Sequence, residues 1–238
     1  MKNVAIIGFP KCATTSLIHF LQTYFHKDYH ILPGEPNHEE VLSALNLDDR
    51  SPPLLFKNPS IIYELSKWTP ILQQCKIIIC FQHPIDFIQS YYQYRRMEIE
   101  QRFLISDEET PLLSLETILS DSTLCWHGIC SQHMNLLSYV YDVYSLFDYS
   151  LILLLSMKEL TRHSNIYYSR VCRFLCLSYD SHYTASHENK NESKQWISPD
   201  TLHFLQLRKP MYDDMYQTLL RLEYKCLTFF FTLDSNSN

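Results

Sequence analysis

The stretch VAIIGFPKCATTSL, residues 4–17, joins a continuous apolar run to a segment with helical spacing. The apolar run ends at Gly8, which predicts a buried strand, and large apolar side chains then recur at helical intervals over 14–25. We expect the three hydroxyl side chains at the start of that helix to cap it. Backbone N–H groups converge between a buried strand and a helix N-terminus, where the helix dipole adds positive potential. With the charge of Lys11, the segment predicts a phosphate-binding loop.

The glycine and the lysine of this loop have a spacing that excludes a Walker A motif. That motif has a glycine directly before its lysine and four residues after its first glycine. Here Pro10 precedes Lys11, which lies three positions after Gly8. The spacing disfavours a P-loop nucleotide kinase, which stays open as an alternative function. For the loop itself, the alternative is an ordinary capped helix beside a surface lysine.

Apolar runs alternate with helical segments along the rest of the chain. Further strands are predicted over 54–56, 76–81 and 150–155. Further helices are predicted over 61–72, 84–97, 112–119, 128–147, 166–175, 198–207 and 211–222. Because the strands are apolar on both faces, the fold class is α/β, with a parallel sheet flanked by helices on both sides. We expect one domain over 1–233 and a disordered tail over 234–238.

Composition limits the function classes. Of the 238 residues, 46% are hydrophobic and 19% are charged, and the net charge is −6, so the chain is globular and no general nucleic-acid binder. The apolar runs are shorter than the ~20 residues of a membrane span. The eight cysteines form no disulfide framework and are expected to be reduced and mostly buried. There are only three glycines, against roughly 17 for average usage, so each marks a position with a backbone requirement.

The loop over 8–17, GFPKCATTSL, resembles a motif of the sulfotransferases that use 3′-phosphoadenosine 5′-phosphosulfate. Their 5′-phosphosulfate loop is usually written G-x-P-K-x-G-T-T-S-L, and Ala13 stands where the family has its second glycine. The resemblance implies a P-loop-like sulfotransferase fold. It also implies that the donor's phosphosulfate is bound by Lys11, Cys12, Ala13, Thr14, Thr15 and Ser16.

The second strand–helix junction, KIIICFQHPIDFIQSYY over 76–92, resembles the family's 3′-phosphate motif in a degenerate form. That motif has an apolar strand, then R-x-P, then a helix with a second arginine and a serine. Pro84 and Ser90 match it, whereas Gln82 and Phe87 replace the two arginines. The resemblance implies that Gln82 and Ser90 bind the 3′-phosphate, weakly, because glutamine offers only neutral donors. Further candidates for this phosphate are Lys190 and Lys194, in a predicted surface loop over 187–194.

Two shorter segments carry the candidate acceptor chemistry. GEPNH, residues 34–38, is similar to the K-E-x-x-F segment of glycan sulfotransferases, which implies that Glu35 is the catalytic base. LFKNP, residues 55–59, resembles the family's K-S-P segment, which implies that Lys57 places a cation on the transferring sulfuryl group. No histidine follows Lys57 directly, as it does in relatives that act on small molecules, so the glycan type is favoured. The alternatives are a solvated loop acid and a solvated lysine at a strand end.

A third segment, WHGI over 126–129, is similar to the family's G-x-Y-x-x-x-L stretch, which makes His127 a second candidate base. The cysteines and histidines around it lack the spacing of a zinc finger, so no metal is expected. These residues are Cys125, His127, Cys130 and His133.

The resemblance thus implies transfer of a sulfuryl group from 3′-phosphoadenosine 5′-phosphosulfate to a hydroxyl or amine of an acceptor, with a carbohydrate as the expected partner. Lys11 would stabilise the departing phosphate. The main alternative is a catalytically weak or inactive nucleotide-binding relative, which the residues at positions 13, 82 and 87 favour. Without an anchor or leader the sequence as written indicates a cytoplasmic protein, whereas an incomplete N-terminus would allow the Golgi lumen.

Overall fold

The computed structural model describes residues 2–46, 52–103, 136–183 and 199–235. The chain divides into two compact units. The first comprises Met1–Gln82, Tyr139–Lys190 and Leu219–Asn238, and the second comprises His83–Ser138 and Asn191–Thr218.

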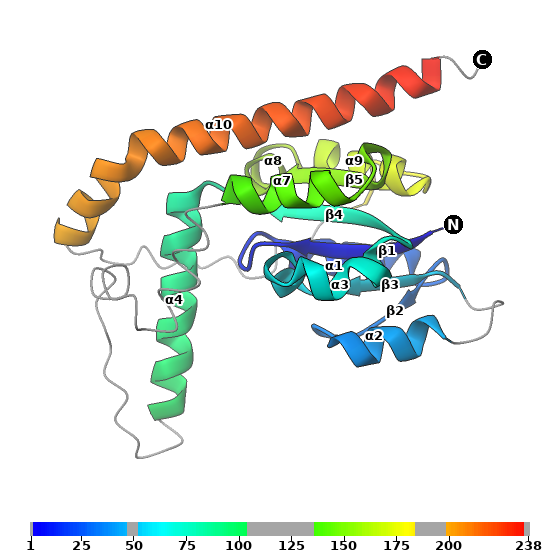
Figure 1. The fold of residues 1–238 in the computed structure, drawn as a ribbon, viewed down its shortest axis with the longest axis horizontal. Coiled ribbons are helices and arrows are strands. Elements are labelled where there is room, and N and C mark those ends of the chain that lie inside the picture. Colours follow the sequence, from blue (N-terminus) through cyan, green and yellow to red (C-terminus); the bar gives the residue numbers. More distant parts are fainter. Residues whose placement is uncertain (1, 47–51, 104–135, 184–198, 236–238) are drawn as a thin grey trace. The chain divides into compact units, whose positions relative to one another are not determined.

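A parallel sheet of five strands forms the centre of the first unit, in the order β2-β3-β1-β4-β5 (Figure 1). The strands are β1 (Asn3–Gly8), β2 (His30–Ile31), β3 (Leu54–Lys57), β4 (Cys75–Phe81) and β5 (Ile152–Ser156). Their side chains are buried almost without interruption from β3 to β5, because helices cover both faces. The predicted α/β class with a parallel sheet and flanking helices is confirmed.

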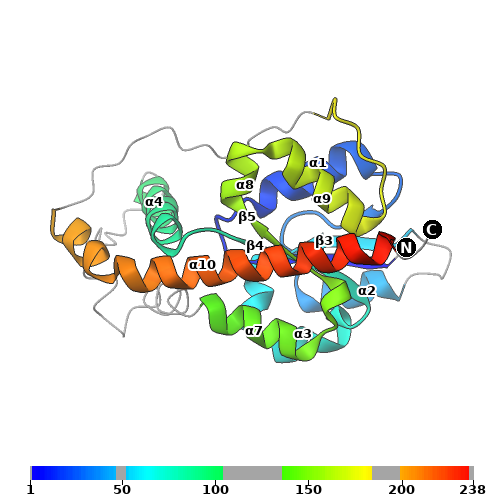
Figure 2. The ribbon, with the colours of Figure 1, turned by 90° about the horizontal axis from the view of Figure 1, so that it is seen from above.

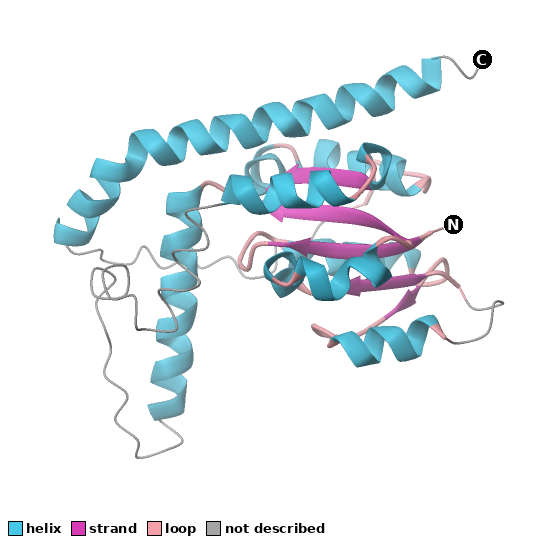
Figure 3. Ribbon diagram, in the orientation of Figure 1, coloured by secondary structure: helices cyan, strands magenta, loops and turns pink. Residues whose placement is uncertain are grey.

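The helices of this unit lie on the two faces of the sheet (Figure 2). One face carries α1 (Thr14–Phe25), α8 (Met157–Arg162) and α9 (Ser164–Leu175). The other carries α2 (His38–Leu45), α3 (Leu65–Leu72) and the part of α7 (Leu136–Leu146) that belongs to the unit. Figure 3 shows the strands as a single layer between these helices. In such a sheet the loops that follow the parallel strands meet at one edge, and Lys11, Glu35, Lys57 and Gln82 lie at or shortly after the ends of four of these strands.

Several predicted boundaries need correction. The predicted helix over 61–72 is split into a 3-10 helix, η1 (Pro59–Tyr63), and α3, because Glu64 has a non-helical backbone with φ −126° and ψ 34°. The predicted strand over 150–155 begins two residues later, because the Asp148 side chain accepts the Ser150 N–H and winds Tyr149–Leu151 into a 3-10 turn. Three short elements were not predicted, namely β2, α2 and α8. They are too short for a periodic pattern to show.

The described part of the second unit consists of α4 (Pro84–Phe103), the first residues of α7 and the first half of α10 (Pro199–Ser235). The two helices predicted over 198–207 and 211–222 are one continuous helix that passes through Pro210. A proline removes one backbone donor, and here helix-forming residues on both sides carry the helix across it. His83 Nε2 lies 3.0 Å from Asp213 Oδ1 and thereby ties the start of α4 to α10.

The cysteines that the structure describes agree with the expectation of mostly buried thiols. Cys12, Cys75, Cys80 and Cys172 are buried and free, and Cys176 is free and exposed. In the described part of the chain, no helix has the combination of length and apolarity that crossing a membrane requires. The predicted helix over 112–119, the first residues of the helix over 128–147 and the loop over 187–194 lie outside the described residues.

Candidate active site

The loop after β1 begins with a close backbone contact between β1 and β4. Phe9 N–H donates to the Cys80 carbonyl at 3.2 Å, and Gly8 has φ +127°. A Cβ at Gly8 would lie 2.4 Å from the Cys80 oxygen, so only glycine fits there. The first glycine of the motif therefore has a structural reason, which is to let the loop leave the sheet beside β4.

Two further loop residues adopt the left-handed backbone region without being glycine. Lys11 has φ 61° and Ala13 has φ 64°. Such a conformation costs a non-glycine residue roughly 1–2 kcal/mol. The strain at Ala13 falls at the position where the resembling motif has glycine, which explains why that motif prefers a residue without a Cβ.

Helix α1 starts directly after this strained residue. Ala13 is its N-cap residue and supplies no side-chain hydrogen bond, so the expectation that hydroxyl side chains cap the helix is wrong. Thr14, Thr15 and Ser16 lie within the first turn, and Thr14 and Ser16 are buried. Because the Ala13 side chain accepts no hydrogen bond, it does not bind the backbone N–H groups of the first turn. These N–H groups and the helix dipole together favour the binding of an anion at this end of α1.

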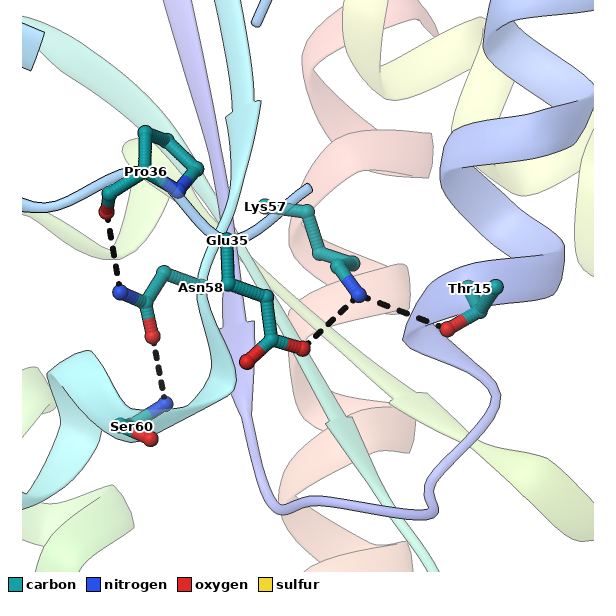
Figure 4. Close-up of polar contacts among 6 residues, drawn as sticks. All are labelled: Thr15, Glu35, Pro36, Lys57, Asn58 and Ser60. Carbon is teal, nitrogen blue, oxygen red and sulfur yellow. Dashed lines mark hydrogen bonds and ion pairs between the residues drawn. The ribbon is translucent and has the colours of Figure 1, made fainter. Parts of the chain in front are cut away.

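Lys57 lies at the carboxyl end of β3 and connects two other segments (Figure 4). Its Nζ is 2.9 Å from Oε1 of Glu35 and 3.4 Å from Oγ1 of Thr15. The Lys57 side chain is 10% exposed, whereas that of Glu35 is 51% exposed. Three predicted site residues, Thr15, Glu35 and Lys57, therefore meet at one point, with a buried ammonium group between a hydroxyl and a solvent-facing carboxylate.

The segment that carries Glu35 is fixed by a residue that the sequence analysis missed. Asn58 Nδ2 donates to the Pro36 carbonyl at 3.1 Å, and its Oδ1 accepts the Ser60 N–H at 3.0 Å. The Asn58 N–H in turn donates to the Ile6 carbonyl of β1 at 3.0 Å. An asparagine before a proline at a strand end is a common turn signal, and this is the only signal in the sequence that indicates its role.

Gln82, the residue in place of the first arginine, contacts the β1 loop. Its Nε2 donates to the Lys11 carbonyl at 3.2 Å, and the residue is only 6% exposed. Phe87, in place of the second arginine, is fully buried. Ser90 lies on α4 in the second unit, whereas the loop lies in the first.

The thiol of Cys12 is not suited to nucleophilic chemistry. Burial, with the neighbouring Cys80 thiol, raises the pKa of Cys12 well above its ordinary value. Burial likewise raises the pKa of Cys80 to about 12. Both thiols stay protonated at neutral pH, so Cys12 serves the loop as a small buried apolar group.

Among the described residues, no group of histidine, cysteine, aspartate and glutamate side chains is arranged to hold a metal ion. The remaining candidates of the sequence analysis lie outside the described residues. These are Trp126, Gly128 and Ile129, with Cys125, His127, Cys130, His133, Lys190 and Lys194.

Comparison with known proteins finds similarity in structure. No family model and no curated protein matches the sequence. The structure is similar to a sulfotransferase from Alicyclobacillus acidocaldarius, with a TM-score of 0.63, 15% identity, and 94% of this chain and 96% of that chain covered. It is also similar to mouse sulfotransferase SULT7A1 complexed with PAP, with a TM-score of 0.53, 13% identity, and 98% and 89% covered. The chain therefore has the sulfotransferase fold, as the two strand–helix junctions predicted.

Proposed function

We propose that this protein transfers a sulfuryl group from 3′-phosphoadenosine 5′-phosphosulfate to a hydroxyl or amine of an acceptor. The observation that carries the proposal is the position of the Lys57 ammonium group. It lies between the Glu35 carboxylate and the Thr15 hydroxyl, which belongs to the first turn of α1. A cation, a proton acceptor and an anion-binding loop are thus within one side-chain length of each other at the edge of the sheet.

The β1 loop fits the phosphosulfate of the donor. The first-turn N–H groups of α1, with Thr14, Thr15 and Ser16, offer donors to an anion, and Lys11 adds a charge to the same loop. The sulfotransferase from mouse that shares the fold was solved complexed with PAP, the nucleotide that remains after transfer. Gln82 and Ser90 remain the proposed ligands of the 3′-phosphate, with Gln82 also supporting the loop through Lys11.

The chemistry needs few groups. The acceptor oxygen or nitrogen forms a bond to sulfur while the bond between sulfur and the 5′-phosphate oxygen breaks, and the nucleotide leaves with the electron pair. Glu35 would take the acceptor's proton, because its carboxylate faces solvent where an acceptor arrives. Lys57 would stabilise the sulfuryl oxygens and Lys11 the departing phosphate, so that positioning and charge account for most of the rate.

The proposed acceptor class is carbohydrate. The proposal rests on the pairing of Glu35 with Lys57 and on asparagine, not histidine, directly after that lysine. Sugar hydroxyls are weak acids, so transfer to them requires a positioned base such as a carboxylate. Phenols ionise more readily and depend less on the base.

The test is transfer of radiolabelled sulfate from the donor to a panel of desulfated glycans, simple phenols and amines. We expect labelled glycan with wild type and a loss of about 10²–10⁴-fold with Glu35→Gln, which keeps the shape of the side chain. Glu39→Gln, an exposed acid in the first turn of α2, is the matched control and should leave transfer unchanged. If Glu35→Gln transfers at the wild-type rate, Glu35 is not the base.

A second candidate function is nucleotide binding without transfer. This candidate is favoured by the two residues that stand in place of the motif's arginines. Gln82 donates to the Lys11 carbonyl and Phe87 is buried, so neither supplies a cation to the nucleotide. Saturable binding of 3′-phosphoadenosine 5′-phosphate, with no transfer to any acceptor of the panel, would support this candidate over the first.

A further inference from the structure

We propose that Asn58 is a positioning residue that holds the Glu35 segment opposite Lys57. The catalytic consequence of this inference rests on the proposed function. The hydrogen bond from Asn58 to the Pro36 carbonyl, called the link below, is a property of the structure. Asn58 directly follows Lys57, so one turn of chain carries both the cation and the group that fixes the carboxylate (Figure 4).

The two ends of the Asn58 side-chain amide have different partners. The oxygen accepts the Ser60 N–H at 3.0 Å and caps the 3-10 helix η1, which fixes the rotation of the amide. The nitrogen is thereby directed to the Pro36 carbonyl, 3.1 Å away. The backbone of Asn58 is itself attached to the central strand, because its N–H donates to the Ile6 carbonyl at 3.0 Å. The Glu35 segment is thus connected through one amide to the centre of the sheet.

The segment needs such a connection. On the N-terminal side, its last backbone hydrogen bond to the sheet is that of the Leu32 N–H, which donates to the Leu55 carbonyl at 3.0 Å. On the C-terminal side the capping box of Asn37 and Glu40 starts α2. Gly34 lies between these two points, with φ +67° and open space around its Cβ position, so neither side-chain packing nor ordinary backbone preference fixes this residue.

The hydrogen bond to Pro36, together with the burial of the Pro36 ring, therefore holds the backbone next to the Glu35 carboxylate. The carbonyl that it holds belongs to the residue directly after Glu35, and the carboxylate is 2.9 Å from Lys57 Nζ. Because the Glu35 side chain is 51% exposed, water competes for it, and the pair with Lys57 persists only while the segment is held in place.

Two substitutions separate the link from the cap. Asn58→Ser keeps a good capping oxygen for the Ser60 N–H but is too short and lacks the amide donor for Pro36. Asn58→Asp keeps the shape and the capping oxygen and replaces the donor by an acceptor. Ser60→Ala is the matched control, because Ser60 contacts Asn58 through its backbone N–H and not through its side chain.

The first measurement is the rate at which Lys57 is acylated by acetic anhydride, read by mass spectrometry against the exposed Lys27 as internal standard. We expect both Asn58 variants to raise the Lys57 rate about threefold to tenfold, because the ammonium group loses its fixed partner, and Ser60→Ala to match wild type. Thermal melts of the variants verify folding. Wild-type acylation of Lys57 in both folded Asn58 variants would overturn the proposal. This assay needs no catalytic activity, so it decides on the link even if the proposed function fails.

The second measurement is a double-mutant cycle on sulfuryl transfer. We expect Asn58→Ser to lower kcat about tenfold with little change in the KM for the donor. In a Glu35→Gln background the same substitution should have almost no further effect, because the group that it positions is already inactive. An equal loss of kcat in both backgrounds would contradict a role through Glu35. If the wild-type protein transfers no sulfuryl group, the proposed function is contradicted. The acylation rate of Lys57 then decides by itself whether Asn58 holds the Glu35 segment.

Discussion

Lys57 is a lysine whose side chain is nearly enclosed by the protein at the end of a buried strand. A buried ammonium group is retained only when it is paired, and here Glu35 and Thr15 provide the partners. The pair is asymmetric, since the lysine is 10% exposed and the glutamate 51%. Removing the lysine therefore leaves a carboxylate that water can solvate, whereas removing the glutamate leaves a buried charge.

This asymmetry predicts the effect of Lys57→Met, which keeps the length of the side chain and removes its charge. We expect transfer to fall by about 10²–10³-fold, because the cation proposed to stabilise the sulfuryl oxygens is lost. We expect the free energy of unfolding to change by less than about 1 kcal/mol, because Glu35 remains hydrated. Transfer rates and urea denaturation measure the two effects. An unchanged transfer rate would remove Lys57 from the mechanism.

At Ala13, a substitution of alanine by glycine should stabilise the protein, whereas the same substitution inside a helix destabilises it. At φ 64° the Cβ of Ala13 is strained, so Ala13→Gly should stabilise the protein by roughly 0.5–1 kcal/mol. The matched control is Ala44→Gly in the helix α2, which should destabilise it by about 0.5–1 kcal/mol. Urea denaturation of the two variants measures both values. Destabilisation by Ala13→Gly would mean that the loop does not hold Ala13 in the left-handed region.

At the scale of elements, contacts between strand ends and the segments that follow them organise the first unit. Gln82, directly after β4, binds the Lys11 carbonyl of the loop after β1. At the end of β5 the Ser156 N–H donates to Oε1 of Glu223 on α10 at 3.1 Å, and Arg170 of α9 contacts Glu159 of α8. The first two contacts tie together segments far apart in the sequence, and the third joins two consecutive helices.

The Gln82 contact predicts that Gln82→Leu loosens the loop that is proposed to hold the phosphosulfate. A neutral hydrogen bond is worth roughly 0.5–1.5 kcal/mol, so nucleotide binding should weaken about threefold to tenfold. Because Gln82 supports the 5′ loop and is also a proposed ligand of the 3′-phosphate, both adenosine 5′-phosphosulfate and 3′-phosphoadenosine 5′-phosphate should bind more weakly in calorimetric titrations, and the nucleotide with the 3′-phosphate should lose the larger factor. Gln74→Leu, which removes a similar contact to the Pro70 carbonyl at the surface, is the control. A loss confined to the nucleotide with a 3′-phosphate would contradict the role of Gln82 in the loop, and no loss for either nucleotide would contradict both roles.

The carboxylate of Glu223, on α10, contacts the end of β5 and predicts that the stability of the protein depends on pH. Burial is the largest cause that raises the pKa of Glu223 to about 7, with Glu159 nearby as a smaller one. An unfolded glutamate has a pKa near 4.3, so between about pH 4.3 and 7 the folded state binds more protons. Stability from Glu223 is therefore fully present below that window and is lost as the pH rises through 7.

Glu223→Gln, which resembles the protonated acid, should therefore be close to wild type at pH 5 and more stable than wild type at pH 8. The expected difference between the two pH values is on the order of 2 kcal/mol. Urea denaturation of both proteins at the two pH values measures it. The groups around Glu223 titrate in both proteins, so the comparison isolates this residue. A difference that does not change with pH would contradict the protonation assigned to Glu223.

At the scale of the whole molecule, the sequence predicted the parallel sheet and the loop after β1 because their signals are local. A β-branched apolar run such as 77–81, which ends at a turn signal, indicates a buried strand, and the loop motif lies within ten consecutive residues. The sequence did not predict β2, α2 or Asn58, because two-residue strands and single amide contacts depend on which segments meet in the folded chain. The continuous helix α10 was missed because Pro210 is normally a helix breaker.

The most direct test of the proposed phosphosulfate site is a calorimetric titration of 3′-phosphoadenosine 5′-phosphate into the full chain and into its Lys11→Ala variant. It needs no knowledge of the acceptor. The site predicts saturable binding of one nucleotide per chain, about 10–100-fold weaker in the variant, because one charge-assisted contact of about 1.5–3 kcal/mol is lost. No binding by the wild type at millimolar nucleotide, or equal binding by both proteins, would contradict a donor site in the loop after β1.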